Sequence, residues 1–117
     1  MAKASDVRKF ALALDGVEEK SHFGSPSFRL NNRIFLQTST KKNEAIFKLS
    51  PVHQELLFKA RPKTFKPEIW GSLRWARLNL DGVPPGELKA LVQEAYDQVA
   101  APSSRAAKKK TVGRKAR

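Results

Sequence analysis

The sequence predicts an α/β fold of the α+β type, in which a curved antiparallel sheet of about four or more strands is backed by N-terminal, middle and C-terminal helices. Segments with apolar residues at helical spacing occur before, between and after segments in which apolar and polar residues alternate. Short turn sequences such as Asn31-Asn32 and Asp81-Gly82 separate these segments. The chain has 117 residues, of which 40% are hydrophobic, so it can build one core.

The first predicted element is a helix over Ser5–Leu14. Ser5 is suited to cap it, and Asp6 falls in its first turn. An apolar stripe continues to Leu14, and Gly16 ends the helix. The charged residues that follow, Glu18-Glu19 beside Lys20, predict a solvent-exposed loop.

A β-hairpin is predicted over Ser27–Ser39, because Asn31-Asn32 can adopt the positive φ angles of a tight turn. A two-residue turn pairs Leu30 with Arg33 and Phe28 with Phe35. This register leaves three residues on the opposite face of the hairpin, namely Arg29, Ile34 and Leu36. A third strand over Ala45–Leu49, with Ala45, Phe47 and Leu49 on one side, completes a meander.

The second half predicts two helices and one more strand. Ser50-Pro51 starts a helix over Pro51–Ala60 whose apolar stripe is Val52, Leu56, Leu57 and Ala60. The stretch 63–73 contains Pro67 and predicts an irregular loop with a short helical turn. From Arg74 the period is two, with Ala76, Leu78 and Leu80 toward the core and Trp75, Arg77 and Asn79 outward. An amphipathic helix over Pro85–Ala100 follows and is expected to pack on the sheet.

The charge distribution divides the chain into a domain over 1–102 and a basic tail over 103–117. The tail holds seven of the 23 basic residues and none of the 11 acidic residues. It therefore supplies more than half of the formal net charge of the whole chain, which is +12. With one Val as its only sizeable apolar side chain, the tail is expected to be disordered in isolation. Its cations are Arg105, Lys108, Lys109, Lys110, Arg114, Lys115 and Arg117.

Several classes of function have no support in the sequence. The absence of cysteine excludes disulfide scaffolds, thiol nucleophiles and iron–sulfur clusters. We find no nucleophile elbow, no phosphate-cradling glycine loop and no metal-ligand spacing around His22 and His53. We therefore expect a non-enzymatic protein with no cofactor and no metal. No membrane-length apolar stretch or signal peptide is present, so the expected location is cytoplasmic, away from the membrane.

Four short motifs, in this order and spacing, resemble the MmcQ/YjbR-like family of small bacterial proteins. They are Gly16-Val17-Glu18-Glu19, Phe23-Gly24-Ser25-Pro26-Ser27-Phe28-Arg29-Leu30, Arg33-Ile34-Phe35 and Leu80-Asp81-Gly82-Val83-Pro84. The likeness runs from about Asp6 to Pro102. It implies a CyaY-like or double-wing fold, and double-wing relatives suggest DNA binding through the sheet. It carries over no catalytic residue.

A basic and aromatic stretch is the candidate nucleic-acid-binding surface of the domain. The residues expected to contact phosphate or bases there are Lys41, Lys42, Lys63, Lys66, Arg74, Trp75 and Arg77. We expect DNA as the partner, with RNA as an alternative, and the tail as an added source of affinity without sequence preference. The competing interpretation is scattered solubilising charge and an incidental basic tail. The domain would then be a protein-interaction module, with a partner surface around Ile34 and Leu36, or a domain of another, uncharacterised function. Either reading is compatible with a monomer or a weak dimer.

Overall fold

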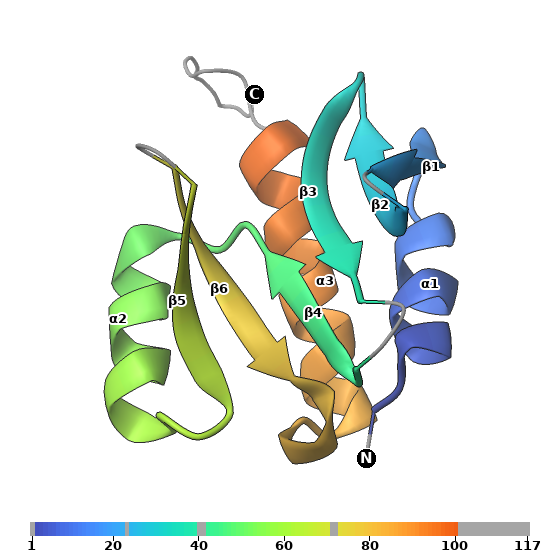
Figure 1. The fold of residues 1–117 in the computed structure, drawn as a ribbon. Coiled ribbons are helices and arrows are strands. Elements are labelled where there is room, and N and C mark those ends of the chain that lie inside the picture. Colours follow the sequence, from blue (N-terminus) through green and yellow to red (C-terminus); the bar gives the residue numbers. More distant parts are fainter. Residues whose placement is uncertain (1, 23, 40–41, 71–72, 101–117) are drawn as a thin grey trace.

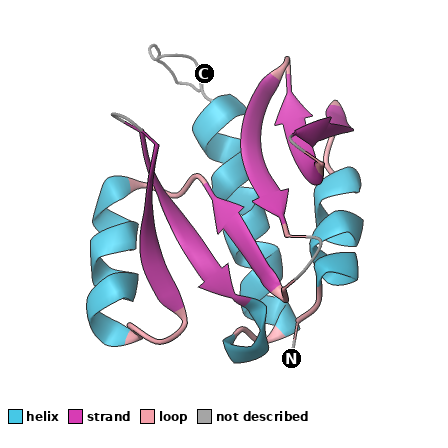
Figure 2. Ribbon diagram, viewed as in Figure 1, coloured by secondary structure: helices cyan, strands magenta, loops and turns pink. Residues whose placement is uncertain are grey.

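The computed structural model describes residues 2–22, 24–39, 42–70 and 73–100. A six-stranded antiparallel sheet in the order β1-β2-β3-β4-β6-β5 forms one layer, and three helices form the other (Figures 1 and 2). The α+β class, the antiparallel sheet and the supporting helices are therefore confirmed. The elements are α1 (Ala4–Leu12), β1 (Val17–His22), β2 (Ser25–Leu30), β3 (Arg33–Thr38), β4 (Glu44–Phe47), α2 (Pro51–Ala60), β5 (Phe65–Trp70), β6 (Leu73–Asn79) and α3 (Pro85–Ala100), with a 3₁₀ turn at Leu80–Gly82.

The helix starts depend on side chains that accept backbone hydrogen bonds. The Ser50 hydroxyl accepts from the backbone N–H of His53 at 3.3 Å, as expected for the start of α2. Helix α1 begins at Ala4, so the prediction of Ser5 as its cap was wrong. The cap is Lys3, two residues earlier, and the Asp6 carboxylate accepts from its backbone N–H at 3.0 Å.

The β2–β3 hairpin turns at Asn31 and Asn32, whose φ angles of 52° and 67° confirm the predicted left-handed turn. Leu30 pairs with Arg33 as expected. The predicted pairing of Phe28 with Phe35 was wrong, because a bulge in the register pairs Phe28 with Leu36. Both Phe35 and Leu36 are consequently buried, and Leu36 cannot contribute to an exposed partner surface.

Two strands lie where the sequence predicted loops. Strand β1 contains Glu18, Glu19 and Lys20, which are exposed at one edge of the sheet and so lack the apolar alternation that marks a strand. Strand β5 occupies most of the predicted irregular loop. It tolerates Pro67 because it is the other edge strand, where a missing N–H need not break a ladder.

All three helices pack on the same face of the sheet. Helix α3 buries Leu88, Leu91, Val92, Ala95 and Val99 against β2, β3 and β4. Helix α2 covers β5 and β6 but buries only Leu57 and Gln54; Val52 and Leu56, expected in its apolar stripe, are 72% and 61% exposed. The sheet separates these helices from its second face, which is where the outward side chains of β3, β4, β5 and β6 gather.

Candidate nucleic-acid interface

The second face of the sheet, here called the open face, carries one continuous row of side chains that are polar apart from Ile46. The strand register places Ser27 opposite Gln37, Gln37 opposite Ile46, Ile46 opposite Arg77, and Arg77 opposite Lys66. Residues that pair in this way share a face of the sheet. Five neighbouring strands, from β2 to β5, therefore each contribute one residue to the row.

Arg77 is held at the centre of this row by two carboxylates. Its Nε and Nη2 atoms donate to Oε1 of Glu68 on β5 at 3.0 and 2.7 Å, and its Nη1 atom donates to Oε1 of Glu44 on β4 at 2.9 Å. The hydrogen bond with Glu68 raises the pKa of Arg77 above its ordinary value, burial partly opposes this, and Glu44 adds to the rise. The guanidinium is thus a fixed cation whose charge is already balanced.

The lysine hollow, defined by Lys42, Lys63 and Lys66, lies beside Arg77. These residues come from the turn before β4, the connection between α2 and β5, and β5 itself. Thr64, Asn79, Glu44 and Arg77 complete the lining of the hollow. The structure thus brings together four of the predicted contact residues, with four cations and one carboxylate around one depression. Such an arrangement attracts phosphate or another anion.

The other predicted contact residues do not join this cluster. Trp75 shares the open face with Arg77, as the alternation along β6 predicted, but it is 5% exposed and therefore not accessible for a contact. β6 lies between β4 and β5, so Trp75 belongs to an interior strand and pairs with Glu68. Arg74 shares the helix-covered side of β6 with Ala76, and its backbone carbonyl accepts from Gln54 at 3.0 Å. Lys41 and the tail residues 103–117 lie outside the described residues.

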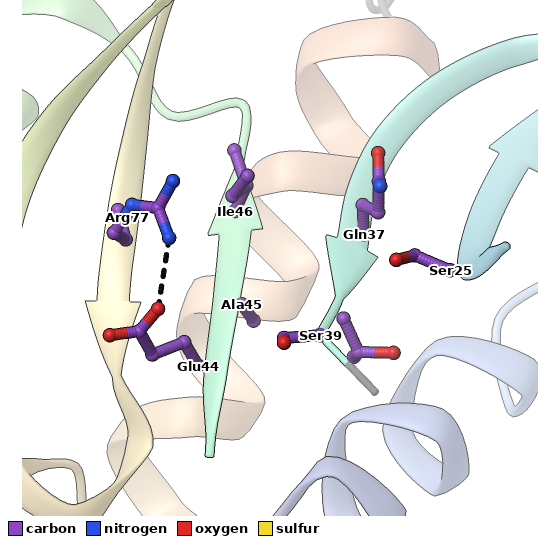
Figure 3. Close-up of a pocket in the computed structure, with 8 residues that line it drawn as sticks. Ser25, Gln37, Ser39, Glu44, Ala45, Ile46 and Arg77 are labelled. Atoms are coloured by element: carbon purple, nitrogen blue, oxygen red, sulfur yellow. Dashed lines mark hydrogen bonds and ion pairs between the residues drawn. The ribbon is translucent and has the colours of Figure 1, made fainter. Parts of the chain in front are cut away.

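A second depression, the Gln37 hollow, adjoins the lysine hollow and is shown in Figure 3. Ser25 of β2, Gln37 and Ser39 at the end of β3, and Ile46 of β4 contribute to its lining. It shares Glu44 and Arg77 with the lysine hollow, and the Arg77 guanidinium points toward Glu44 beneath it (Figure 3). The Oε1 atom of Gln37 is buried and has no hydrogen-bond partner within the part of the chain that is described.

Sequence reasoning missed Gln37, Glu44 and Glu68 as members of this face. Glu44 and Glu68 lie 33 and nine positions from Arg77, and only the pairing of β4 and β5 with β6 brings them together. Alternation along β3 could have placed Gln37 outward, but the bulge at Phe35 shifts the period there. Once β5 is assigned as a strand, its register on β6 indicates the contact of Glu68 with Arg77, whereas the contact of Glu44 requires the register of β4 on β6.

One further side-chain contact was not anticipated. The Nδ1 atom of His53 lies 2.6 Å from Oε1 of Glu94 on α3. Glu94 Oε2 also accepts from the backbone N–H of Ser50 at 3.0 Å. This pair lies on the helix side of the sheet and joins α2 to α3. It belongs to the scaffold and has no contact with the open face.

The described segments contain no group of three or more His, Asp or Glu side chains arranged to hold a metal ion. Among the helices within these segments, none is long and apolar enough to span a membrane.

Comparison with known proteins identifies the family of the chain. A solved structure, the Deinococcus radiodurans protein DR2400 with a domain of the DUF419 family, has a TM-score of 0.78 and 23% sequence identity, over 88% of this chain and 82% of that one. It supports the same fold. No curated protein matches the chain. The YjbR family model matches residues 12–98, from the end of α1 to the end of α3. The chain therefore belongs to the YjbR family.

Proposed function

We propose that this YjbR-family chain is a non-enzymatic protein that binds nucleic acid, with DNA the expected polymer and RNA the alternative. The observation that carries the proposal is the convergence of Lys42, Lys63 and Lys66 from three segments on one depression of the open face. Lysine side chains bind phosphate oxygens as point charges, and this contact carries no sequence information. The fold class alone does not imply this function, because unrelated functions share such folds.

Charge balance assigns the members of the face different roles. Arg77 is neutralised by Glu44 and Glu68, so it positions the two hollows rather than supplying net attraction. The lysines have their ammonium groups at the ends of flexible stems, and Lys42, Lys63 and Lys66 are exposed. They therefore provide the electrostatic attraction of the domain, and the seven cations of the tail add to it.

Fluorescence anisotropy tests the proposal with the full chain and labelled double-stranded and single-stranded DNA at several salt concentrations. The test variant is Lys63→Gln with Lys66→Gln. The matched control is Lys9→Gln with Lys89→Gln, which removes the same charge from α1 and α3 on the helix side. The test variant should bind more weakly than the control at every salt concentration. Equal binding by the two variants would show that net charge alone accounts for the affinity of the domain.

A protein-interaction module remains the second candidate, and an exposed apolar stripe favours it. Val52 and Leu56 stand one helical turn apart on α2, and they are 72% and 61% exposed. Ile69 on β5, the strand that α2 covers, is 55% exposed. If Val52→Ser with Leu56→Ser abolished a salt-insensitive complex with a protein partner, this second function would be preferred.

A further inference from the structure

We propose that the two hollows together bind one unpaired nucleotide, with its phosphate over the lysine hollow and an amino-bearing base in the Gln37 hollow. This inference rests on the proposed function and adds to it a polymer state and a base preference. The proposed site would bind a single strand and not a duplex, because a base that is paired inside a duplex cannot enter a depression in a sheet.

The geometry supports a nucleotide because the two hollows share two residues. Glu44 and Arg77 line both depressions, so a group bound in one is adjacent to a group bound in the other. The lysine hollow has three lysines around Thr64 and Asn79, which suits an anion. The Gln37 hollow has no lysine in its lining, and its one cation is already paired with Glu44. A phosphate and a neutral hydrogen-bonding ring match these two environments.

Two acceptors in the Gln37 hollow, the Glu44 carboxylate and Gln37 Oε1, favour a ligand with hydrogen-bond donors. The Glu44 carboxylate accepts hydrogen bonds and cannot donate them when ionised. Gln37 Oε1 is an acceptor without a partner, and a buried polar atom in this condition has an unfavourable free energy. The terminal torsion of a glutamine is soft, so its carboxamide can turn toward a ligand. The exocyclic amino groups of cytosine and adenine are the donors that Glu and Gln side chains recognise on bases.

The size and the floor of the Gln37 hollow suit a small planar ring. Its volume is about 170 Å³, several times the roughly 30 Å³ share of one water molecule in the liquid. Ile46 lies in the same strand row between Gln37 and Arg77, and its half-buried side chain offers an apolar contact for a ring. A single ion would leave most of this space unfilled.

The test compares two single-stranded oligonucleotides of equal length, one of deoxycytidine and one of deoxyuridine. These bases have the same ring size, but cytosine has an amino group where uracil has a carbonyl. Anisotropy with the full chain should give deoxycytidine at least about fivefold tighter binding, the lower end of the discrimination expected of one good base contact. The tail contributes equally to both oligonucleotides, so it cancels in this ratio.

Gln37→Leu should lower the ratio, because it removes one of the two acceptors for the amino group and so weakens deoxycytidine binding more than deoxyuridine binding. Because Gln37 Oε1 has no partner, this substitution removes no hydrogen bond of that atom, and the melting temperature verifies the fold. Gln37→Glu keeps an acceptor and should keep the preference with weaker overall binding. Gln93→Leu, the same change on α3, should leave both affinities as they were.

The outcomes separate this inference from the proposed function. Binding of both oligonucleotides with a ratio near one would overturn the base pocket and leave the phosphate contact intact. An undiminished preference in Gln37→Leu would also overturn it, since Gln37 would then have no part in the discrimination. Absence of binding to either oligonucleotide would overturn both proposals. In Lys63→Gln with Lys66→Gln, both affinities should fall by the same factor and the ratio should remain.

Discussion

Nδ1 of His53 on α2 and Oε1 of Glu94 on α3 lie 2.6 Å apart, although the residues are 41 positions apart in the chain. The other carboxylate oxygen of Glu94 accepts from the backbone N–H of Ser50 at 3.0 Å. One carboxylate therefore serves both the start of α2 and a side chain in its first turn. It links the two helices that support opposite halves of the sheet.

Glu94→Ala should lower the free energy of unfolding by about 1–2 kcal/mol, because it removes a charge-assisted contact to His53 and the partner of the Ser50 N–H. Urea unfolding followed by circular dichroism measures the change. Asp97→Ala, on the exposed surface of the same helix, is the control and should change the stability by less than about 0.5 kcal/mol. A loss for Glu94→Ala no larger than that of the control would contradict the linking role.

Gln54→Leu should destabilise the protein by about 2 kcal/mol, because the Gln54 carboxamide is buried and joins two segments. Its Nε2 atom donates to the carbonyls of Leu49 at 2.8 Å and Arg74 at 3.0 Å. Thermal unfolding should show this loss, whereas Gln93→Leu on exposed α3 should cause little change. Unchanged stability in Gln54→Leu would mean that the two hydrogen bonds of the Gln54 carboxamide contribute no more to stability than an apolar side chain at this position.

Asn32→Gly should stabilise the chain by up to about 1 kcal/mol, because glycine adopts the left-handed region with less strain than asparagine. Asn32 has a φ angle of 67° at the second position of the β2–β3 turn. The free energy of unfolding from urea titration measures the effect. Asn32→Val should be destabilising, because a positive φ angle is strained for a β-branched residue. Unchanged stability of Asn32→Val would contradict the turn geometry.

Replacement of Arg77 by Met should lower stability by about 1 kcal/mol, because Glu44 and Glu68 lose their shared cation at a partly exposed site. Since the raised pKa keeps Arg77 protonated at every pH below its ordinary value, the titration of Arg77 itself should add no pH dependence between pH 6 and 9. Its contribution would be lost only in strongly alkaline solution. Urea unfolding at several pH values tests this. The wild type and Arg77→Met should differ in free energy of unfolding by the same amount from pH 6 to 9. A steady decrease of this difference across the range would contradict a permanent charge on Arg77.

Removal of residues 103–117 should weaken DNA binding without changing sequence preference, because the tail carries only phosphate-binding charge. If all seven tail cations contact phosphate, the slope of log K against log salt should become shallower by about six. Anisotropy at several salt concentrations measures both quantities, and circular dichroism verifies that the shortened chain is folded. Equal affinity and equal slope for the two chains would exclude a role for the tail.

The elements that the sequence predicted well are those with local signals. Ser50-Pro51 marks the start of α2, the predicted amphipathic helix over Pro85–Ala100 coincides with α3, and Asn31-Asn32 forms the β2–β3 turn. These signals depend on neighbours within a few positions, so one sequence is enough to find them. The alternation from Arg74 likewise identified β6 and its buried Ala76 and Leu78.

The edge strands and the site were harder because they depend on partners distant in the chain. The charged residues of β1 and the proline of β5 are compatible with loops, and only pairing with β2 and β6 makes strands of them. Without β5, the ion pair of Arg77 with Glu68 and the buried position of Trp75 could not be inferred. Lys42, Lys63 and Lys66 were named among the candidate contact residues, but their position around one hollow, beside the Gln37 hollow, required the register of the strands.

The two edge strands of the sheet also affect whether copies of this chain aggregate at high concentration. An exposed edge strand can extend its sheet with a strand from another molecule, which is a common route to aggregation. Here Glu18, Glu19 and Lys20 place charges on one edge, and Pro67 interrupts the backbone donors of the other. We expect that concentrated solutions of the chain resist fibrillar growth, and that Pro67→Val would shorten the lag before aggregation.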